Sequence, residues 1–281
     1  LLGGGPVEMI LAFFGAGVGM YVRKKLLERH ITLLANVAAG VAAACCTYLL
    51  LFKLFEVIFT VSSVHQSGYI CSMLFIIPGF PFITSGIDMA KLDMRSGLER
   101  LSYAVMIVLI ATMAAWLMAL ALHLKPVDFL PLNLSMLQYI VFRLLTSFCG
   151  VFGFSIMFNS PVPLAMSAAI IGAISNTLRL ELVDLASLPP AAAAFFAAMI
   201  AGLLASAYKK HSGFPRIAIT VPSIVIMVPG LYLYRAIYNL GTMNLSISAS
   251  WFASATLIIL ALPLGLIFAR IMTDKMFRYC T

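Results

Sequence analysis

Long apolar blocks, each about twenty residues and almost free of charge, make up most of this chain. A helix of ~20 apolar residues crosses the ~30 Å hydrocarbon core of a bilayer, whereas a membrane β-strand needs only ~10 alternating residues. Of the 281 residues, 63% are hydrophobic and 10% are charged, against about 25% charged in a typical soluble domain. The blocks therefore predict an all-α polytopic membrane protein and exclude a soluble globular domain.

Nine blocks are long enough to span a membrane, and short joints between them carry most of the charges. We place the spans near residues 6–22, 31–53, 69–88, 101–123, 137–158, 163–179, 190–208, 216–238 and 249–271. The five cysteines lack metal-ligand spacing and mostly lie inside apolar blocks, so we expect no disulfide framework and no metal site. They are Cys45, Cys46, Cys71, Cys149 and Cys280.

The basic residues favour one side of the membrane. With nine spans, thirteen of them fall on one side: Arg23, Lys24, Lys25, Arg29, Lys91, Arg95, Arg100, Lys209, Lys210, Arg216, Arg270, Lys275 and Arg278. The other side has four, Lys53, Lys125, Arg179 and Arg235, while Arg143 stays inside a span. Because cytoplasmic loops carry an excess of Lys and Arg, we expect a cytoplasmic C-terminus and Leu1 outside.

The second half of the sequence repeats the pattern of the first. Each half has a short Ala/Gly-rich span, a Ser-Gly pair and then a span interrupted at Pro-Gly. The corresponding pairs are Pro6/Gly15 and Pro163/Gly172, Ser67-Gly68 and Ser212-Gly213, and Pro78-Gly79 and Pro229-Gly230. The second half adds a leading helix, 137–158, and the opening LLGGGP looks like the end of its missing equivalent. We therefore expect a five-plus-five repeat whose first helix is largely cut off.

An odd number of helices per repeat places the second copy upside down in the membrane, in agreement with the charge count. Inverted repeats with one broken helix each are typical of secondary transporters. Backbone breaks at membrane depth are tolerated only against protein or water. The alternative is that each Pro-Gly pair merely kinks a packed helix. We expect the first repeat at 1–123, an outer loop at 124–136 and the second repeat at 137–281.

The stretches around the two breaks are similar to a known family. IIPGFPFITSGIDMAKLDMRSGLERLSYA (76–104) and VPSIVIMVPGLYLYRAIYNL (221–240) resemble the two signature regions of the bacterial threonine/serine exporter family. The likeness covers essentially the whole chain. Family members typically have ten spans in two five-helix halves, sometimes encoded as separate proteins, and many carry a cytoplasmic segment before the first span. By this comparison the chain lacks that segment and most of the first helix.

The resemblance implies an inner-membrane secondary transporter that exports a small amino acid of the threonine/serine type from the cytoplasm. The alternatives are export of a dicarboxylate such as succinate, or an accessory membrane subunit without transport activity of its own. No ATP-binding motif is visible, so we expect coupling to protons by antiport. The expected partners are the substrate, protons and the lipid bilayer. We expect no cofactor and no nucleic acid. The chain could also form a homo-oligomer.

The substrate site is expected at the two breaks. Past each Pro-Gly pair a half-helix begins, and its free N–H groups and positive dipole end attract an anion such as a carboxylate. The candidate substrate-binding residues are Pro78, Gly79, Pro81, Thr84, Asp88, Pro229, Gly230, Tyr234 and Arg235. A substrate hydroxyl could bond Ser72, Thr84, Ser85, Thr220 or Ser223, although such side chains more often bond their own helix backbone.

Asp88 and Arg235 are the ionisable candidates, and each has a plainer interpretation. Asp88 would bind a substrate ammonium group or a coupled proton, or else pair with Lys91 or Arg95 at the membrane rim. Arg235 would clamp a carboxylate with its planar guanidinium, or else reach the outer headgroups within a belt formed by Tyr232, Tyr234 and Tyr238.

The other charged residues give less information about function. Arg143, one turn into its span, is expected to extend to the interface, and Glu181 and Asp184 to be solvated at the outer rim. Four widely separated histidines and the absence of HExxH, GxSxG or phosphate-binding glycine motifs argue against an enzyme.

Overall fold

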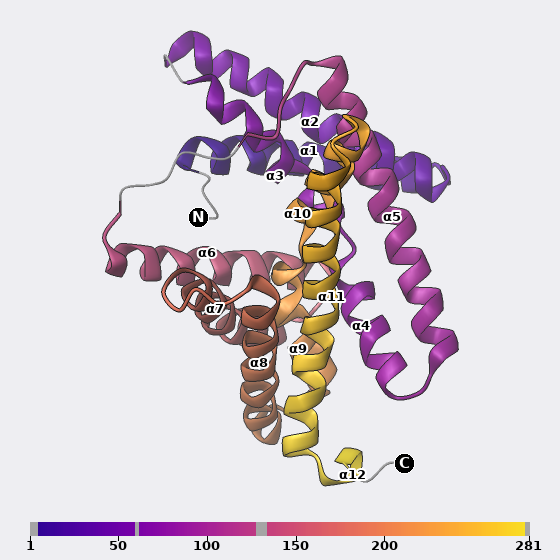
Figure 1. Cartoon of the computed structure of the whole chain (residues 1–281), viewed down its shortest axis with the longest axis vertical. Coiled ribbons are helices and arrows are strands. Elements are labelled where there is room, and N and C mark those ends of the chain that lie inside the picture. The colour runs from indigo at the N-terminus through magenta and orange to yellow at the C-terminus, as the bar shows by residue number, and fades with distance from the viewer. Residues whose placement is uncertain (1–4, 60–61, 128–133, 279–281) are drawn as a thin grey trace. The chain divides into compact units, whose positions relative to one another are not determined.

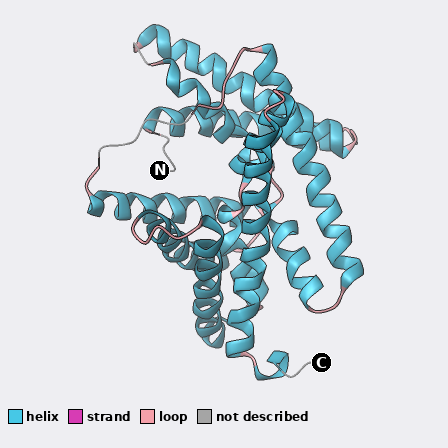
Figure 2. Cartoon of the chain, viewed as in Figure 1, coloured by secondary structure: helices cyan, strands magenta, loops and turns pink. Residues whose placement is uncertain are grey.

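The structure is a computed structural model that describes residues 5–59, 62–127 and 134–278. Within these ranges every regular element is a helix, and Figure 2 shows no strand in them. Cys280, residues 1–4 of the opening LLGGGP, and residues 128–133 of the expected outer loop lie outside the described residues.

The described residues of the first half form five α-helices and two short 3₁₀ segments, one on each side of the third α-helix. In chain order they are α1 (Pro6–Glu28), α2 (Leu33–Ile58), η1 (Ser63–Gly68), α3 (Tyr69–Met73), η2 (Leu74–Ile76), α4 (Gly79–Ala90) and α5 (Met94–Ala121). The second half follows in Figure 1 as α6 (Met136–Met157), α7 (Val162–Asp184), α8 (Pro190–Ser212), α9 (Arg216–Ile224), η3 (Val225–Met227), α10 (Gly230–Gly241), α11 (Leu245–Thr273) and α12 (Lys275–Arg278).

Local sequence signals explain where several helices begin and end. Ser135 caps α6, since its hydroxyl accepts from Gln138 N while Gln138 Oε1 accepts from Ser135 N. Proline occupies the first helical turn of α1, α7 and α8, where a missing N–H costs nothing. Gly213, with φ of 69°, ends α8 in the left-handed conformation.

Seven helices are long and apolar enough to cross a membrane, and two bent pairs raise the number of candidate spans to as many as nine within the described residues. The bent pairs are His65–Ile76 with Gly79–Ala90 and Arg216–Met227 with Gly230–Gly241. The protein is therefore an all-helical, multi-pass membrane protein, as the apolar blocks predict. The helices run past the expected spans, and α1 continues to Glu28, where Lys25 and Glu28 pair 2.9 Å apart on its exposed face.

The order of helices in the first half recurs in the second. α1 and α7 both have 23 residues, α4 and α10 both have 12, and α5 and α11 have 28 and 29. In each half a short helix passes into a 3₁₀ turn immediately before the Pro-Gly break. α6 is the additional leading helix of the second half.

The chain divides into two compact units, and each unit takes segments from both halves of the sequence. Unit 1 comprises residues 1–78, 103–133 and 230–252, and unit 2 comprises 79–102, 134–229 and 253–281. The chain leaves one unit for the other at each Pro-Gly break, between Pro78 and Gly79 and between Pro229 and Gly230. The compact units are thus distinct from the sequence repeats.

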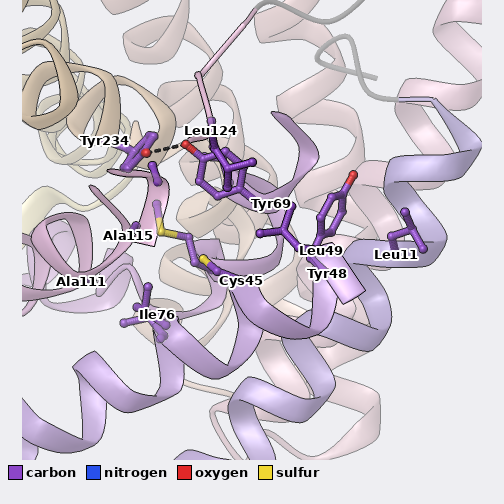
Figure 3. Close-up of a cluster of buried hydrophobic side chains, with 14 of the residues drawn as sticks. Leu11, Cys45, Tyr48, Leu49, Tyr69, Ile76, Ala111, Ala115, Leu124 and Tyr234 are labelled. Carbon is purple, nitrogen blue, oxygen red and sulfur yellow. Dashed lines mark hydrogen bonds between the residues drawn. The ribbon is translucent and has the colours of Figure 1, made fainter. Parts of the chain in front are cut away.

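Each unit has a core of its own. In unit 1, Leu11, Tyr48, Phe52, Tyr69 and Tyr234 are among a cluster of completely buried side chains, part of which Figure 3 shows. In unit 2, Ala168 and Ala169 on α7 pack against Val151 on α6. Small residues at such contacts let membrane helices approach closely, which compensates for the absence of a hydrophobic driving force in lipid.

Candidate functional site

Each break has the same local cause. Ile77 and Val228 are extended, with ψ of 119° and 132°, because the proline that follows excludes the helical conformation. The chain then re-enters a helix at Gly79 and at Gly230, after bends of 49° and 43°. The first N–H groups of α4 and α10 have no partner within their own helix, so both half-helices present a positive dipole end.

The glycine of each break packs against residues that precede the other break. A Cβ on Gly79 would lie 2.7 Å from Val225 Cγ2 and 3.1 Å from Val228 Cγ2, both within unit 2. A Cβ on Gly230 would lie 3.0 Å from Leu74 Cδ2 and 3.1 Å from Ile77 Cγ1, within unit 1. Within each unit, therefore, the glycine of one break packs against side chains of the segment that precedes the other break.

In unit 1 the first segment of one broken helix contacts the second segment of the other. Tyr69 of α3 and Tyr234 of α10 are completely buried, and their hydroxyl oxygens lie 2.5 Å apart (Figure 3). Their rings meet edge to face with centroids 6.0 Å apart. Tyr234 is consequently a core residue, and the idea that it belongs to an interfacial aromatic belt is wrong.

Arg235 points toward an aromatic pair on the same unit. Its guanidinium carbon lies 4.9 Å from the centre of the Trp251 ring, and Tyr232 packs edge to face on Trp251 at 5.1 Å. A cation–π contact of this kind helps to hold a guanidinium in place.

The candidate hydroxyls mostly bond their own helices. Thr84 Oγ1 donates to Phe80 O at 3.0 Å, and Ser85 Oγ donates to Phe82 O at 2.8 Å. Ser72, Thr220 and Ser223 likewise donate to carbonyls three or four residues earlier. Each hydroxyl retains lone pairs for a further donor, but its proton is already committed to the backbone.

Asp88, on the last turns of α4, has an arginine partner that sequence proximity did not indicate. Arg100 Nη1 lies 3.1 Å from Asp88 Oδ2, without the angle of a hydrogen bond, so the contact is an ion pair only. The expected alternatives were Lys91 and Arg95, and Arg95 instead pairs with Glu99 on the exposed face of α5. Beyond α4, Asp93 caps α5, and hydrogen bonding from Ser96 lowers the pKa of its carboxyl.

The nine candidate residues fall into two sets. Unit 1 contains Pro78, Gly230, Tyr234 and Arg235, and unit 2 contains Gly79, Pro81, Thr84, Asp88 and Pro229. Within unit 2, α4 packs against α9 and η3, so Gly79 and the residues after it lie beside the segment that leads to Pro229. Pro81 lies in the first turn of α4, where its missing N–H breaks no helical hydrogen bond.

Arg143 corrects a further expectation. Its side chain is only 9% exposed and binds Glu181 at 2.7 Å and also Asp184, so it does not extend to the interface. Glu181 is a largely buried partner in this cluster rather than a solvated rim residue, whereas Asp184 pairs with Arg143 and is half exposed, as expected for the rim. The reason is packing, because α6 and α7 lie side by side and their facing charges neutralise one another in a medium of low dielectric.

The sequence did not predict one buried polar pair. Glu8, in the first turn of α1, is 3% exposed and its Oε1 contacts Nδ1 of His65 in η1. A signal existed, since Glu8 is the only charged residue in the apolar block 6–22. Its partner lies 57 residues away, so the pairing itself could not be predicted from the sequence. In the part of the chain that the structure describes, no group of three His, Cys, Asp or Glu side chains could hold a metal ion.

Comparison with known proteins identifies a relative of this chain. A curated relative, the "Probable succinate transporter subunit YjjP" of Escherichia coli (strain K12), is 32% identical over 119 residues. The match covers 42% of this chain and 44% of the relative, so the chain spans less than half of that protein's length. No solved structure matches the chain.

Family models match both halves of the sequence. Residues 1–123 match the model ThrE, described as "Putative threonine/serine exporter". Residues 143–272 match ThrE_2, described as "Threonine/Serine exporter, ThrE". The two matches follow one another along nearly all of the sequence that carries the two broken helices, and the chain belongs to the threonine/serine exporter family.

Proposed function

We propose that this protein is a secondary active transporter of the inner membrane that exports a small amino acid, of the threonine/serine type, in exchange for protons. Membership of the exporter family supports the class of activity. The observation that carries the proposal is the pair of corresponding Pro-Gly breaks, whose half-helices α4 and α10 begin in close contact with the residues before the other break.

The proposed substrate-binding groups lie close to the Pro-Gly breaks in the sequence. Within unit 1, the dipole end of α10 would attract the substrate carboxylate, and Arg235, which contacts the Trp251 ring, would add a planar two-point contact. Asp88 would bind the substrate ammonium group or a coupled proton, with Arg100 as its partner in the unloaded state. Replacing Arg235 by Lys should then weaken carboxylate binding, because a lysine lacks the planar fork.

The proposed motion follows from the repeat. If the two five-helix repeats have opposite orientations, moving one against the other would open the site alternately to each side. The charge count supports this orientation, with the C-terminus in the cytoplasm. The recurrence of helix order supports the repeat, and no ATP-binding motif is visible in the sequence.

A dicarboxylate such as succinate is the second candidate substrate. It is supported by the printed name of the relative, which describes a subunit of a succinate transporter. The word subunit also favours a partner chain, so an accessory role without independent transport is the remaining alternative. Both carboxylates of a dicarboxylate could use the same dipole ends and Arg235, but neither would need Asp88 as an ammonium ligand.

Efflux from cells tests these possibilities together. Cells that express the chain, and matched cells without it, are loaded with threonine, serine or succinate and the external solute is followed. Faster release of threonine or serine supports the proposal, and release of succinate alone selects the second candidate. Loss of release in Gly79→Val and Gly230→Val, at unchanged membrane insertion, would assign the activity to the breaks.

A further inference from the structure

Glu8 is a carboxylate buried in unit 1 with both oxygens occupied. Oε2 accepts from Gly5 N at 2.7 Å, and Oε1 contacts Nδ1 of the His65 imidazole. Within the described residues, His65 is its ion-pair partner. A carboxylate that leaves water needs an opposite charge or several donors, and the contacts with Gly5 N and the His65 imidazole are of this kind.

His65 gives this buried acid a route to water. The His65 side chain is 25% exposed while that of Glu8 is 4% exposed. The hydroxyl of Tyr48 on α2 donates to His65 O at 2.7 Å and fixes the backbone of η1. Gly68 packs directly against Tyr48 and Glu8. Any larger residue would clash there, because a Cβ would lie 2.0 Å from Tyr48 Oη and 2.8 Å from Glu8 Cγ.

Within the described residues, a tyrosine hydroxyl and a cysteine thiol interact with Glu8 besides His65. The elements packed against α1 are α2, α3 and η1. α2 contributes the Tyr48 hydroxyl, α3 contributes the Cys71 thiol, and η1 contributes His65 itself. The pair therefore carries zero net charge when it holds one proton and one buried negative charge when it holds none.

The contact also joins α1 to the first broken helix. Glu8 belongs to α1, whereas His65 is the first residue of the bent pair His65–Ile76 with Gly79–Ala90. A displacement of that broken helix relative to α1 would separate carboxylate and imidazole, hydrate both and release the proton. Conversely, loss of the proton would weaken the contact and free the broken helix to move.

We propose that Glu8 and His65 form a proton-binding site that couples the first broken helix to the proton gradient, an inference that rests on the proposed exporter function. A proton from water adds to the free nitrogen lone pair of His65 and leaves when that N–H bond breaks, without electron transfer. By the positive-inside count this end of α1 lies outside the cell, the side from which protons enter during export by antiport.

The test uses the full chain in proteoliposomes that contain threonine, serine or succinate and a pH-sensitive dye. Glu8→Gln and His65→Gln should each abolish substrate-driven proton movement and efflux driven by a pH gradient. Exchange of labelled for unlabelled substrate without a gradient should persist within about two-fold. The double variant should lose no more than either single variant, because both residues serve one site.

Glu28→Gln is the matched control, since it removes an exposed carboxylate of the same helix whose side chain is 49% exposed. Its proton movement should equal that of the wild type. A purely structural role for the pair would instead lower exchange and proton movement together in Glu8→Gln and His65→Gln, and would overturn the proposal. So would proton movement that survives in both variants.

A measurement without substrate separates this inference from the proposed function. Infrared spectra of the purified protein are recorded during acidification, and the spectrum of Glu8→Gln is subtracted from that of the wild type. A carboxyl band and an imidazole band that change over the same pH range are expected. If neither band appears in the difference, the proton site is refuted even when export occurs. If both appear but no solute is exported, the exporter function fails instead.

Discussion

At the scale of single residues, the strongest charge cluster of unit 2 is centred on Arg143. Its guanidinium binds Glu181 and Asp184, whose side chains are 18% and 51% exposed. Arg143→Gln would leave the Glu181 charge largely buried without its partner. Breaking a buried pair costs about 3–5 kcal/mol, and the solvent around Asp184 reduces this to roughly 2–3 kcal/mol. Thermal unfolding in detergent should show a clear loss of stability.

Arg95→Gln is the control for that measurement. Arg95 pairs with Glu99 at 3.1 Å, but its side chain is 91% exposed, so the pair contributes little. Equal melting temperatures for Arg143→Gln and Arg95→Gln would contradict the structural role given to Arg143.

The sequence predicts residue roles where the cause is local and fails where the partner is distant. Hydrogen bonding of Thr84 to its own helix follows from chemistry within one turn. Arg143 and Glu8 have partners 38 and 57 positions away, and such pairings depend on how helices pack. An acid inside an apolar block signals that a partner exists, but the partner's identity requires the fold.

At the scale of elements, the Pro-Gly pairs predicted both helix breaks, because proline excludes a helical conformation before it. The packing of Gly79 against Val225 and of Gly230 against Leu74 depends on the fold and could not be read from the sequence. The ends of the helices were harder to predict from the sequence than the breaks. Hydropathy marks the apolar part of a helix. α1 continues through Lys25 and Glu28, which pair with one another, and α7 continues through Glu181, which pairs with Arg143 of α6.

The two break glycines should respond differently to alanine. Alanine is favoured over glycine inside helices, so Gly79→Ala would be stabilising if its Cβ met nothing. It meets Val225 Cγ2 at 2.7 Å, whereas a Cβ on Gly230 meets its nearest atom at 3.0 Å. We expect at least ten-fold slower efflux for Gly79→Ala and a smaller effect for Gly230→Ala, measured in loaded cells at equal expression.

Two further variants control this comparison. Val225→Ala in the Gly79→Ala background removes the clashing methyl group and should restore part of the efflux rate. Gly153→Ala on α6 places a Cβ in open space and should leave efflux unchanged. The packing argument fails if Gly153→Ala slows efflux as much as Gly79→Ala does, or if Val225→Ala deepens the defect.

At the scale of the whole molecule, the orientation in the membrane rests on the distribution of Lys and Arg. In a cysteine-free background, single cysteines at Lys210 and Thr273 should react with a membrane-impermeant reagent only from the cytoplasmic side. A cysteine at Asp128, which lies outside the described residues, should react only from outside. Labelling of all three from one side would refute the inverted arrangement of the repeats.

The central claim is that this chain alone exchanges a small amino or carboxylic acid for protons. Substrate-dependent proton movement in proteoliposomes that contain only this protein tests it most directly. Adding threonine, serine or succinate on one side should produce proton movement that protein-free vesicles lack and that Gly79→Val abolishes. Labelled substrate that fails to cross, with no proton movement for any of the three solutes, would contradict an autonomous proton-coupled exporter.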